Sequence, residues 1–324
     1  MTIRKAVLCG ARDLRFVEEE APGPGPGEIL VETEVTALST GTDLANYEGR
    51  STELPGAPGY PRQVGYSNVG VIRACGEEVG RWRTGQRVFA LRPHQSAYIA
   101  REDELLVEVP AGVAPEEASL AYLTQLGVAA LRHAGYEAGE RVAVVGLGVI
   151  GLCTVAAAHA MGARVTALGN AESRCRLASE LGAEDAGGRE ADLVVLTANP
   201  WEAFRLAVDQ VRRGGRISIL GFPGRAEAPP PFNPLDAAWF YGKQLTLIGA
   251  GFSPRSEAPS QDIRFNLRRN MEMLFDYQRT GRLSLGRVIT HRLPWSRMRE
   301  AYELAVTRDK SMAAAVFDWR QAAR

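Results

Sequence analysis

The 324-residue sequence has few lysines, few cysteines and no excess of charge of either sign. Lysine occurs only at Lys5, Lys243 and Lys310, so arginine supplies nearly all of the basic charge. Basic and acidic residues number 38 each, and the formal net charge at pH 7 is zero. This balance gives no support to a protein that binds nucleic acid or an acidic membrane through its overall charge.

The four cysteines are too scattered for a dense disulfide framework or a zinc ribbon, because none forms a C-x-x-C pair. The sequence also lacks a run of about 18 apolar residues, so we predict no transmembrane helix. Its first residues lead into a strand-like segment and show no apolar core of a secretory signal. We therefore expect a cytoplasmic protein.

Two patterns of predicted secondary structure divide the sequence into two parts. Residues 1–118 contain short extended segments separated by glycine and proline, which predicts a β-rich part. From residue 119, predicted strands at 141–145, 163–168, 191–197, 215–221 and 244–250 alternate with helices at 116–135, up to about 161, 172–181 and 200–213. This alternation predicts an α/β fold with a doubly wound parallel sheet. A helix at 262–281, a strand at 288–292, a helix at 295–307 and a strand at 313–317 complete the chain.

A glycine loop follows the predicted strand at 141–145. It reads G-L-G-V-I-G over residues 146–151, and an apolar helix continues from it. In this strand–turn–helix context the first glycine permits the tight turn, the second lets the backbone approach a pyrophosphate, and the third allows close helix packing. The helix N-terminus then offers N–H groups to the phosphates. The predicted cofactor-binding residues of the loop are Gly146, Gly148, Val149 and Ile150.

The end of the next strand indicates which dinucleotide binds. An NAD site usually has an acidic residue there, but this sequence has Gly169. A glycine removes repulsion against a 2′-phosphate, and Asn170, Ser173 and Arg174 can donate hydrogen bonds to one. These residues favour NADP over NAD. The alternative is that Arg174 lies on a solvated helix face while Glu172 binds the ribose.

Residues after the later strands are expected to line the nicotinamide half, because ligands of open α/β sheets bind at the carboxyl ends of the strands. These residues are Thr197, Gly221, Phe222 and the segment 249–252.

Several motifs together resemble the medium-chain dehydrogenase/reductase superfamily, which includes the zinc alcohol dehydrogenase-like proteins. They are G-Y-P at 59–61, the glycines at 65 and 70, G-x-R-V at 85–88, G-G-R-I at 214–217 and I-T-H-R at 289–292. The resemblance implies a GroES-like catalytic domain made of residues 1–118 and 253–324, and a Rossmann domain at 119–252. It also implies a small-molecule substrate and a homodimer.

The sequence departs from this family at the positions that bind zinc. Thr40 stands where the family has a cysteine ligand, and Tyr66 and Ser67 replace the histidine and glutamate of its G-H-E motif. The segment 123–126 offers no third ligand, and the four-cysteine lobe is missing. Since zinc needs about three or four ligands, we predict neither a catalytic nor a structural zinc.

Without zinc, other donors must stabilise the developing oxyanion. Thr42 stands where the family has its proton-relay hydroxyl, and Tyr66, with an ordinary pKa of about 10, suits a general acid. His94 lies on the loop that replaces the zinc lobe, and we expect it at the mouth of a cleft. The alternatives are that Thr42 only bonds backbone, that Tyr66 is packing, and that His94 is a solvated loop histidine.

The leading interpretation is a zinc-independent, NAD(P)-dependent oxidoreductase that interconverts an alcohol and a ketone or aldehyde. A second enzyme interpretation is an NADPH-dependent enoyl or quinone reductase. A third, of another class, is a non-catalytic NADPH-binding protein.

Overall fold

The computed structural model describes residues 1–50, 59–185, 187–188, 190–225, 227–251, 253–254 and 264–320. The chain divides into two compact units. Unit 1 comprises Met1–Tyr122, Met271–Arg279 and Ile289–Arg324, and unit 2 comprises Leu123–Asn270 and Thr280–Val288. The N-terminal part and the end of the chain therefore share one unit. Within the described residues, no helix is long and apolar enough to cross a membrane.

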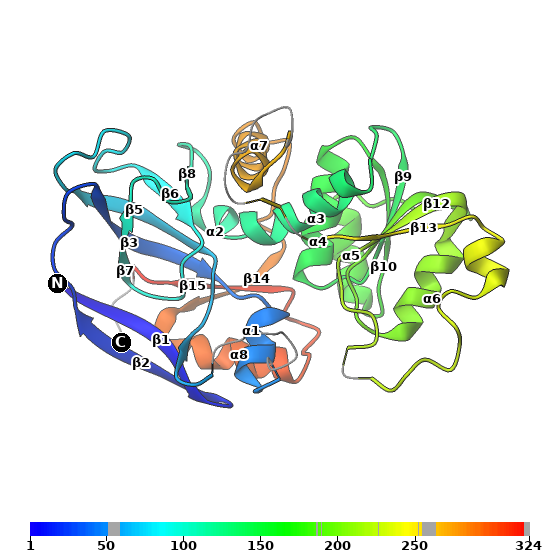
Figure 1. Ribbon diagram of the computed structural model, residues 1–324, viewed down its shortest axis with the longest axis horizontal. Helices are drawn as coiled ribbons and strands as arrows, with labels where there is room; N and C mark the ends of the chain where they lie inside the picture. Colours follow the sequence, from blue (N-terminus) through cyan, green and yellow to red (C-terminus); the bar gives the residue numbers. More distant parts are fainter. Residues whose placement is uncertain are drawn as a thin grey trace. The chain divides into compact units, whose positions relative to one another are not determined.

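Unit 1 is built mainly on antiparallel strands (Figure 1). A three-stranded sheet has the order β2 (Asp13–Glu20), β1 (Thr2–Gly10) and β4 (Arg62–Gln63). A seven-stranded sheet has the order β14 (Ile289–Pro294), β15 (Ala314–Asp318), β3 (Glu28–Ala37), β5 (Asn68–Cys75), β6 (Arg87–Ala90) and β8 (Leu106–Glu108), and β7 (Ala97–Arg101) pairs with β3. Only β14 and β15 run parallel to each other in this sheet.

In unit 1, a helix from the N-terminal part of the chain packs against a helix near its C-terminus through aromatic side chains. They are α1 (Thr42–Tyr47), α2 (Pro115–Ala118), α8 (Met298–Val306) and a 3-10 turn at Trp295–Arg297. Tyr47 of α1 and Tyr302 of α8 are fully buried with ring centroids 4.8 Å apart. Tyr47 also donates its hydroxyl to Glu303 at 2.6 Å. These contacts anchor α1, whose first residue is the candidate site residue Thr42.

Unit 2 contains a five-stranded sheet in which all strands are parallel (Figure 1). Its order is β10 (Arg164–Leu168), β9 (Arg141–Val145), β11 (Ala191–Leu196), β12 (Val211–Ile219) and β13 (Thr246–Gly249). The central strands β9 and β11 are almost continuously buried, as expected when helices cover both faces of a parallel sheet. The predicted α/β class with a parallel sheet is confirmed.

The helices of this part are α3 (Ala121–His133), α4 (Val149–Ala160), α5 (Glu172–Glu180) and α6 (Trp201–Gln210), with a π-helical turn at Ala237–Tyr241. Helix α7 (Leu267–Arg279) begins in unit 2 and continues in unit 1 from Met271. The helix predicted over 116–135 is divided into α2 and α3. The helix predicted over 262–281 begins at Leu267, because the Asn266 side chain accepts the N–H of Arg269 at 2.9 Å and so caps the first turn. Residues 261–263 lie outside the described residues.

The boundary between the units also differs from the predicted limit at residue 252. Unit 2 extends to Asn270. Ser253 and Asn270 are buried and hydrogen-bond to Gln125 of α3, so this segment packs with unit 2. Such a long-range polar contact leaves no local pattern in the sequence.

Candidate active site

The glycine loop after β9 has the geometry of a pyrophosphate-binding turn. Gly146 has a φ of +99°, which residues with a side chain rarely adopt. A Cβ atom at Gly151 would lie 1.8 Å from the carbonyl oxygen of Gly146, so no larger residue fits. Among the described residues beyond the chain neighbours, no atom lies within 4 Å of a Cβ built on Gly148. The loop therefore leaves its backbone open to a ligand, and α4 begins at Val149 with N–H donors for a phosphate.

Thr197, at the end of β11, holds this loop from the neighbouring strand. Its hydroxyl donates to the carbonyl oxygen of Gly146 at 2.7 Å, with the Val145 carbonyl oxygen at 3.2 Å. The side chain thus fixes the backbone of the glycine loop, a contact that the sequence pattern did not predict. Ile150, in the first turn of α4, is half-buried.

The turn after β10 presents the residues predicted to recognise the adenosine ribose. Leu147 lies against Gly169, where a Cβ atom would come within 2.8 Å of the Leu147 Cδ1 atom. Glu172 forms an exposed ion pair with Arg176 at 2.8 Å. This pairing weakens the alternative that Glu172 is held ready for a ribose. The predicted phosphate-binding residues Asn170, Ser173 and Arg174 lie on the same turn, with Asn170 and Ser173 exposed.

The loop after β12 exposes an aromatic ring. Phe222 follows Gly221 and is 55% exposed, and the guanidinium of Arg225 lies 5.1 Å from its ring centroid. The Phe222 N–H donates to the Asn199 Oδ1 atom at 2.9 Å, so Asn199 ties the loop after β11 to the loop after β12. Phe222 is therefore held at the carboxyl end of the sheet, and its contact with a nicotinamide stays a prediction. Phe252 lies outside the described residues.

In unit 1, the structure brings Thr42 and Tyr66 together. Thr42 is exposed at the start of α1, and Tyr66 is half-buried. The side chains of Ser39 and Thr42 lie close enough to the Tyr66 hydroxyl to lower its pKa. The Tyr66 ring packs edge-on against Tyr122, with centroids 5.1 Å apart. Burial, followed by the charge of Asp43, raises the pKa of Tyr66 well above its usual value of 10. The phenol is therefore protonated at neutral pH.

Asp43 is the buried carboxylate beside this pair, and the sequence reasoning did not single it out. Its Oδ2 atom accepts the Ser39 N–H at 3.0 Å, and its Oδ1 atom accepts the Gly65 N–H at 3.1 Å. Burial raises the pKa of Asp43 to about 6, while the two N–H donors and the charge of Arg62 act in the opposite direction. The sequence feature that could have identified Asp43 was its position next to Thr42 in the family's metal-binding motif.

His94 does not lie at the mouth of a cleft, and that expectation is wrong. Its side chain is fully buried and stands edge-on to Phe317, with ring centroids 5.2 Å apart. The His94 backbone N–H donates to the Val64 carbonyl oxygen at 2.8 Å, which carries the ring inward against Gly65. Neither ring nitrogen has a partner among the described residues. Burial lowers the pKa of His94 to about 3, so the ring is neutral.

The residues at the family's zinc positions do not fit a metal. Thr40 and Tyr66 are poor zinc ligands, and the Ser67 hydroxyl is already used, donating to the Ser119 carbonyl oxygen. Over the part of the chain that the structure describes, no group of three or more His, Cys, Asp and Glu side chains is arranged to hold a metal ion.

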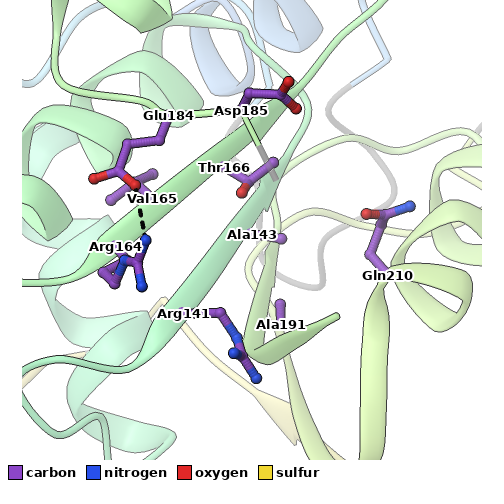
Figure 2. A pocket seen from close by; sticks show the side chains of 9 residues that line it. All are labelled: Arg141, Ala143, Arg164, Val165, Thr166, Glu184, Asp185, Ala191 and Gln210. Atoms are coloured by element: carbon purple, nitrogen blue, oxygen red, sulfur yellow. Dashed lines mark hydrogen bonds and ion pairs between the residues drawn. The ribbon is translucent and has the colours of Figure 1, made fainter. Parts of the chain in front are cut away.

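A small polar pocket lies at the amino ends of the parallel strands, whereas the glycine loop lies at their carboxyl ends (Figure 2). It is lined by the first residues of three strands, Arg141, Arg164 and Ala191. Arg164 faces Glu184 across it, with 3.5 Å between the charged atoms. Since ligands of open α/β sheets bind at the carboxyl ends of the strands, this pocket is not the predicted cofactor site.

Comparison with known proteins agrees with this arrangement. The family described as "Alcohol dehydrogenase GroES-like domain" matches residues 25–124. L-galactonate-5-dehydrogenase of Escherichia coli K12 is 25% identical over 363 residues, covering 98% of this chain and 99% of its own length. Over nearly its whole length the chain is therefore similar to dehydrogenases of the medium-chain dehydrogenase/reductase superfamily. Its GroES-like and Rossmann architecture is that of the superfamily, as the sequence predicted.

Solved structures of superfamily members share the fold at low identity. Galactitol-1-phosphate dehydrogenase from Escherichia coli has a TM-score of 0.80 and 19% identity, covering 97% of this chain and 99% of its own. A protein of Sinorhizobium meliloti 1021 described as a zinc-binding dehydrogenase bound to NADP has a TM-score of 0.77 and 20% identity, covering 98% of this chain and 99% of its own. The relatives that this chain resembles are named dehydrogenases, which supports an alcohol oxidoreductase.

Proposed function

We propose that this protein is a zinc-independent, NADP-dependent oxidoreductase that interconverts a small-molecule alcohol and its ketone or aldehyde. The observation that carries the proposal is the Tyr66 hydroxyl, which stands at a zinc-ligand position of the family, close to the hydroxyl groups of Ser39 and Thr42. A protonated phenol can supply the hydrogen bond to the substrate oxygen that zinc would otherwise polarise.

The cofactor would be held by residues of unit 2. The N–H groups at the start of α4 and the open backbone at Gly148 fit a pyrophosphate. Gly169 carries no charge against a 2′-phosphate, and Ser173 and Arg174 on the following turn supply donors to it. When bound, the nicotinamide ring supplies the hydride that the reaction transfers.

The residues of unit 1 would handle the proton. Tyr66 Oη donates its proton to the substrate oxygen as that oxygen gains negative charge. The Thr42 hydroxyl, which lies near Tyr66 and is exposed, then returns a proton from solvent. Because burial and the Asp43 charge hold the pKa of Tyr66 high, the phenol is protonated at neutral pH and can donate a hydrogen bond to the substrate oxygen.

The test is oxidation of NADPH by the purified protein, followed at 340 nm, with a panel of ketones and aldehydes and a matched panel of enones and quinones. Carbonyl reduction that survives exhaustive treatment with a chelator supports the proposal. Reduction of enones alone would replace it with the enoyl or quinone reductase. Tight NADPH binding without turnover on either panel would instead indicate a binding protein.

We also propose that the enzyme is a homodimer. Strand β13 is the last strand of the parallel sheet order, and its residues are exposed or half-buried. Leu235 and Tyr241, before this strand, are 56% and 73% exposed. An open strand edge beside apolar side chains favours pairing with a second copy. Sedimentation of the wild type as a dimer and of a Leu235→Arg/Tyr241→Arg variant as a monomer would support this interface.

A further inference from the structure

The chain forms a tight turn directly after β12, over Phe222, Pro223, Gly224 and Arg225. The Arg225 N–H donates to the Phe222 carbonyl oxygen at 3.0 Å, and Gly224 has a φ of +76°. Proline at the second position and a glycine of positive φ at the third are typical of a type II turn. Because the ends of such a turn lie within about 7 Å of each other, the sequence F-P-G-R places Phe222 beside Arg225.

Three contacts with the segment after β11 hold this turn in place. The Asn199 Oδ1 atom accepts the Phe222 N–H at 2.9 Å, and the Asn199 carbonyl oxygen accepts the Gly224 N–H at 2.7 Å. The Trp201 ring packs so closely on Gly224 that a Cβ atom there would come within 2.3 Å of the Trp201 Cε2 atom. The turn therefore presents its side chains from a fixed backbone, as a binding site requires.

The two end residues of the turn form a cation–aromatic pair. The Arg225 guanidinium lies 5.1 Å from the centroid of the Phe222 ring, which is 55% exposed, and Arg225 itself is half-buried. The ring attracts the guanidinium and so restricts where its N–H groups lie. A carboxylate further along the same loop, that of Glu227, accepts the N–H of Trp201 at 3.0 Å, at the start of α6. The turn thus presents a positioned cation.

The sheet order places this cation at the substrate end of the proposed cofactor. The glycine loop follows β9 and Gly169 follows β10, which assigns the pyrophosphate and the adenosine ribose to those strands. Strand β12 lies on the other side of β9 and ends at Ile219, just before the turn. A dinucleotide that begins at β10 and crosses the glycine loop therefore extends its nicotinamide toward β12, and the substrate must meet that ring.

We infer that Arg225 is a substrate-binding residue, and that the alcohol or carbonyl substrate carries an anionic group that pairs with its guanidinium. A carboxylate and a phosphate share this chemistry, because the planar fork of N–H groups fits two oxygens of either one. Phe222 is a positioning residue, since its ring holds the guanidinium. The inference rests on the proposed function and names the class of substrate that the same site would take.

The experiment uses two pairs of carbonyl probes that differ in charge, 4-oxopentanoate with its methyl ester and dihydroxyacetone phosphate with dihydroxyacetone. For each probe, kcat/KM is measured by NADPH oxidation, and Kd by calorimetric titration of the protein with NADP⁺ present. Wild type should favour the anionic member of at least one pair about tenfold, and the pair concerned distinguishes a carboxylate from a phosphate. Arg225→Gln should abolish this preference and leave the Kd for NADPH unchanged.

Arg205→Gln is the matched control, because the Arg205 guanidinium also lies near an aromatic ring of unit 2, 5.2 Å from the Phe232 centroid. It removes the same charge and should keep the preference. Phe222→Tyr, which keeps the ring, should also keep it, whereas Phe222→Leu should reduce it.

Equal constants within both pairs, no binding of any probe, or a preference that survives Arg225→Gln would overturn the inference. So would an Arg225→Gln protein that loses NADPH affinity while its preference between the probes stays, because the arginine would then bind a cofactor phosphate. An anion preference in Kd without NADPH oxidation would keep the binding site and remove the proposed function.

Discussion

The carboxylate of Asp43 accepts the backbone N–H of Gly65 at 3.1 Å, and this bond joins the turn that carries Thr42 to the turn that carries Tyr66. The two turns are 22 residues apart in the chain. Asp43 thereby sets the position of the candidate acid and also its acidity, since its charge helps to raise the pKa of Tyr66. The polar arrangement at the former metal position thus depends on a residue that never contacts the substrate in our proposal.

Tyr66→Phe should separate a catalytic hydroxyl from a packing ring. The variant keeps the edge-on contact with Tyr122 and loses only the donor, so Tm and NADPH affinity should stay near wild type. Loss of one oxyanion donor typically lowers turnover by about 10²–10³, and kcat should fall by that factor. Thr42→Val, which removes the hydroxyl that returns the proton, should lower kcat less. Near-wild-type kcat/KM for both variants would show that the two side chains only pack.

Arg174→Ala should weaken the binding of NADPH much more than that of NADH. Losing a charge-assisted phosphate contact costs roughly 1.5–3 kcal/mol, which corresponds to about a 10- to 100-fold rise in Kd. Arg176→Ala is the control on the same helix, because Arg176 pairs with Glu172. Titration of each variant with both cofactors checks this. Equal losses for NADPH and NADH, or a wild type that prefers NADH, would contradict the phosphate contact.

Two glycines of the loop should respond differently to the same substitution. Gly148→Ala places its Cβ in open space at a φ of −73°, so the protein should fold with a normal Tm. The added methyl group blocks the approach of a pyrophosphate, and NADPH affinity should fall at least tenfold. Gly151→Ala brings a Cβ to 1.8 Å from the Gly146 carbonyl oxygen and should lower Tm or prevent folding. A Gly148→Ala protein with full affinity would place the phosphates elsewhere.

His94 should make the fold sensitive to acid. Its pKa falls from an ordinary 6.5 to about 3 on burial, so the unfolded chain binds a proton more readily than the native one. The contribution of His94 is present above pH 6.5 and is lost as pH falls toward 3, by about 3 kcal/mol at pH 4. Removing the titrating ring in His94→Phe should therefore reduce the loss of unfolding free energy between pH 7 and pH 4.

Denaturant unfolding of both proteins at the two pH values measures that difference. Asp43 titrates in the opposite sense, because its pKa is raised to about 6 and its contribution is lost as pH rises through that value. Since Asp43 is present in both proteins, its contribution cancels in the comparison. An identical acid loss in wild type and His94→Phe would show that the ring does not carry this sensitivity.

The sequence by itself determined the parallel sheet and the glycine loop, and it showed which residues stand at the family's zinc positions. Each depends on residues adjacent in the chain: the apolar run of β9, the glycines at 146, 148 and 151, and the substitutions at 40, 66 and 67. Local conformation and ligand chemistry follow from such neighbours because glycine spacing and side-chain type act over a few residues.

Only the tertiary structure decided where the long-range polar groups lie. His94 was expected in a loop at a cleft, yet its backbone bond to Val64 turns the ring into the core. Asp43 is bonded to Gly65, and Gln125 to Ser253 and Asn270, which are 128 and 145 residues away. Burial and hydrogen-bond geometry between distant segments set these pKa values and orientations, and neither is encoded in the spacing of residues along the chain.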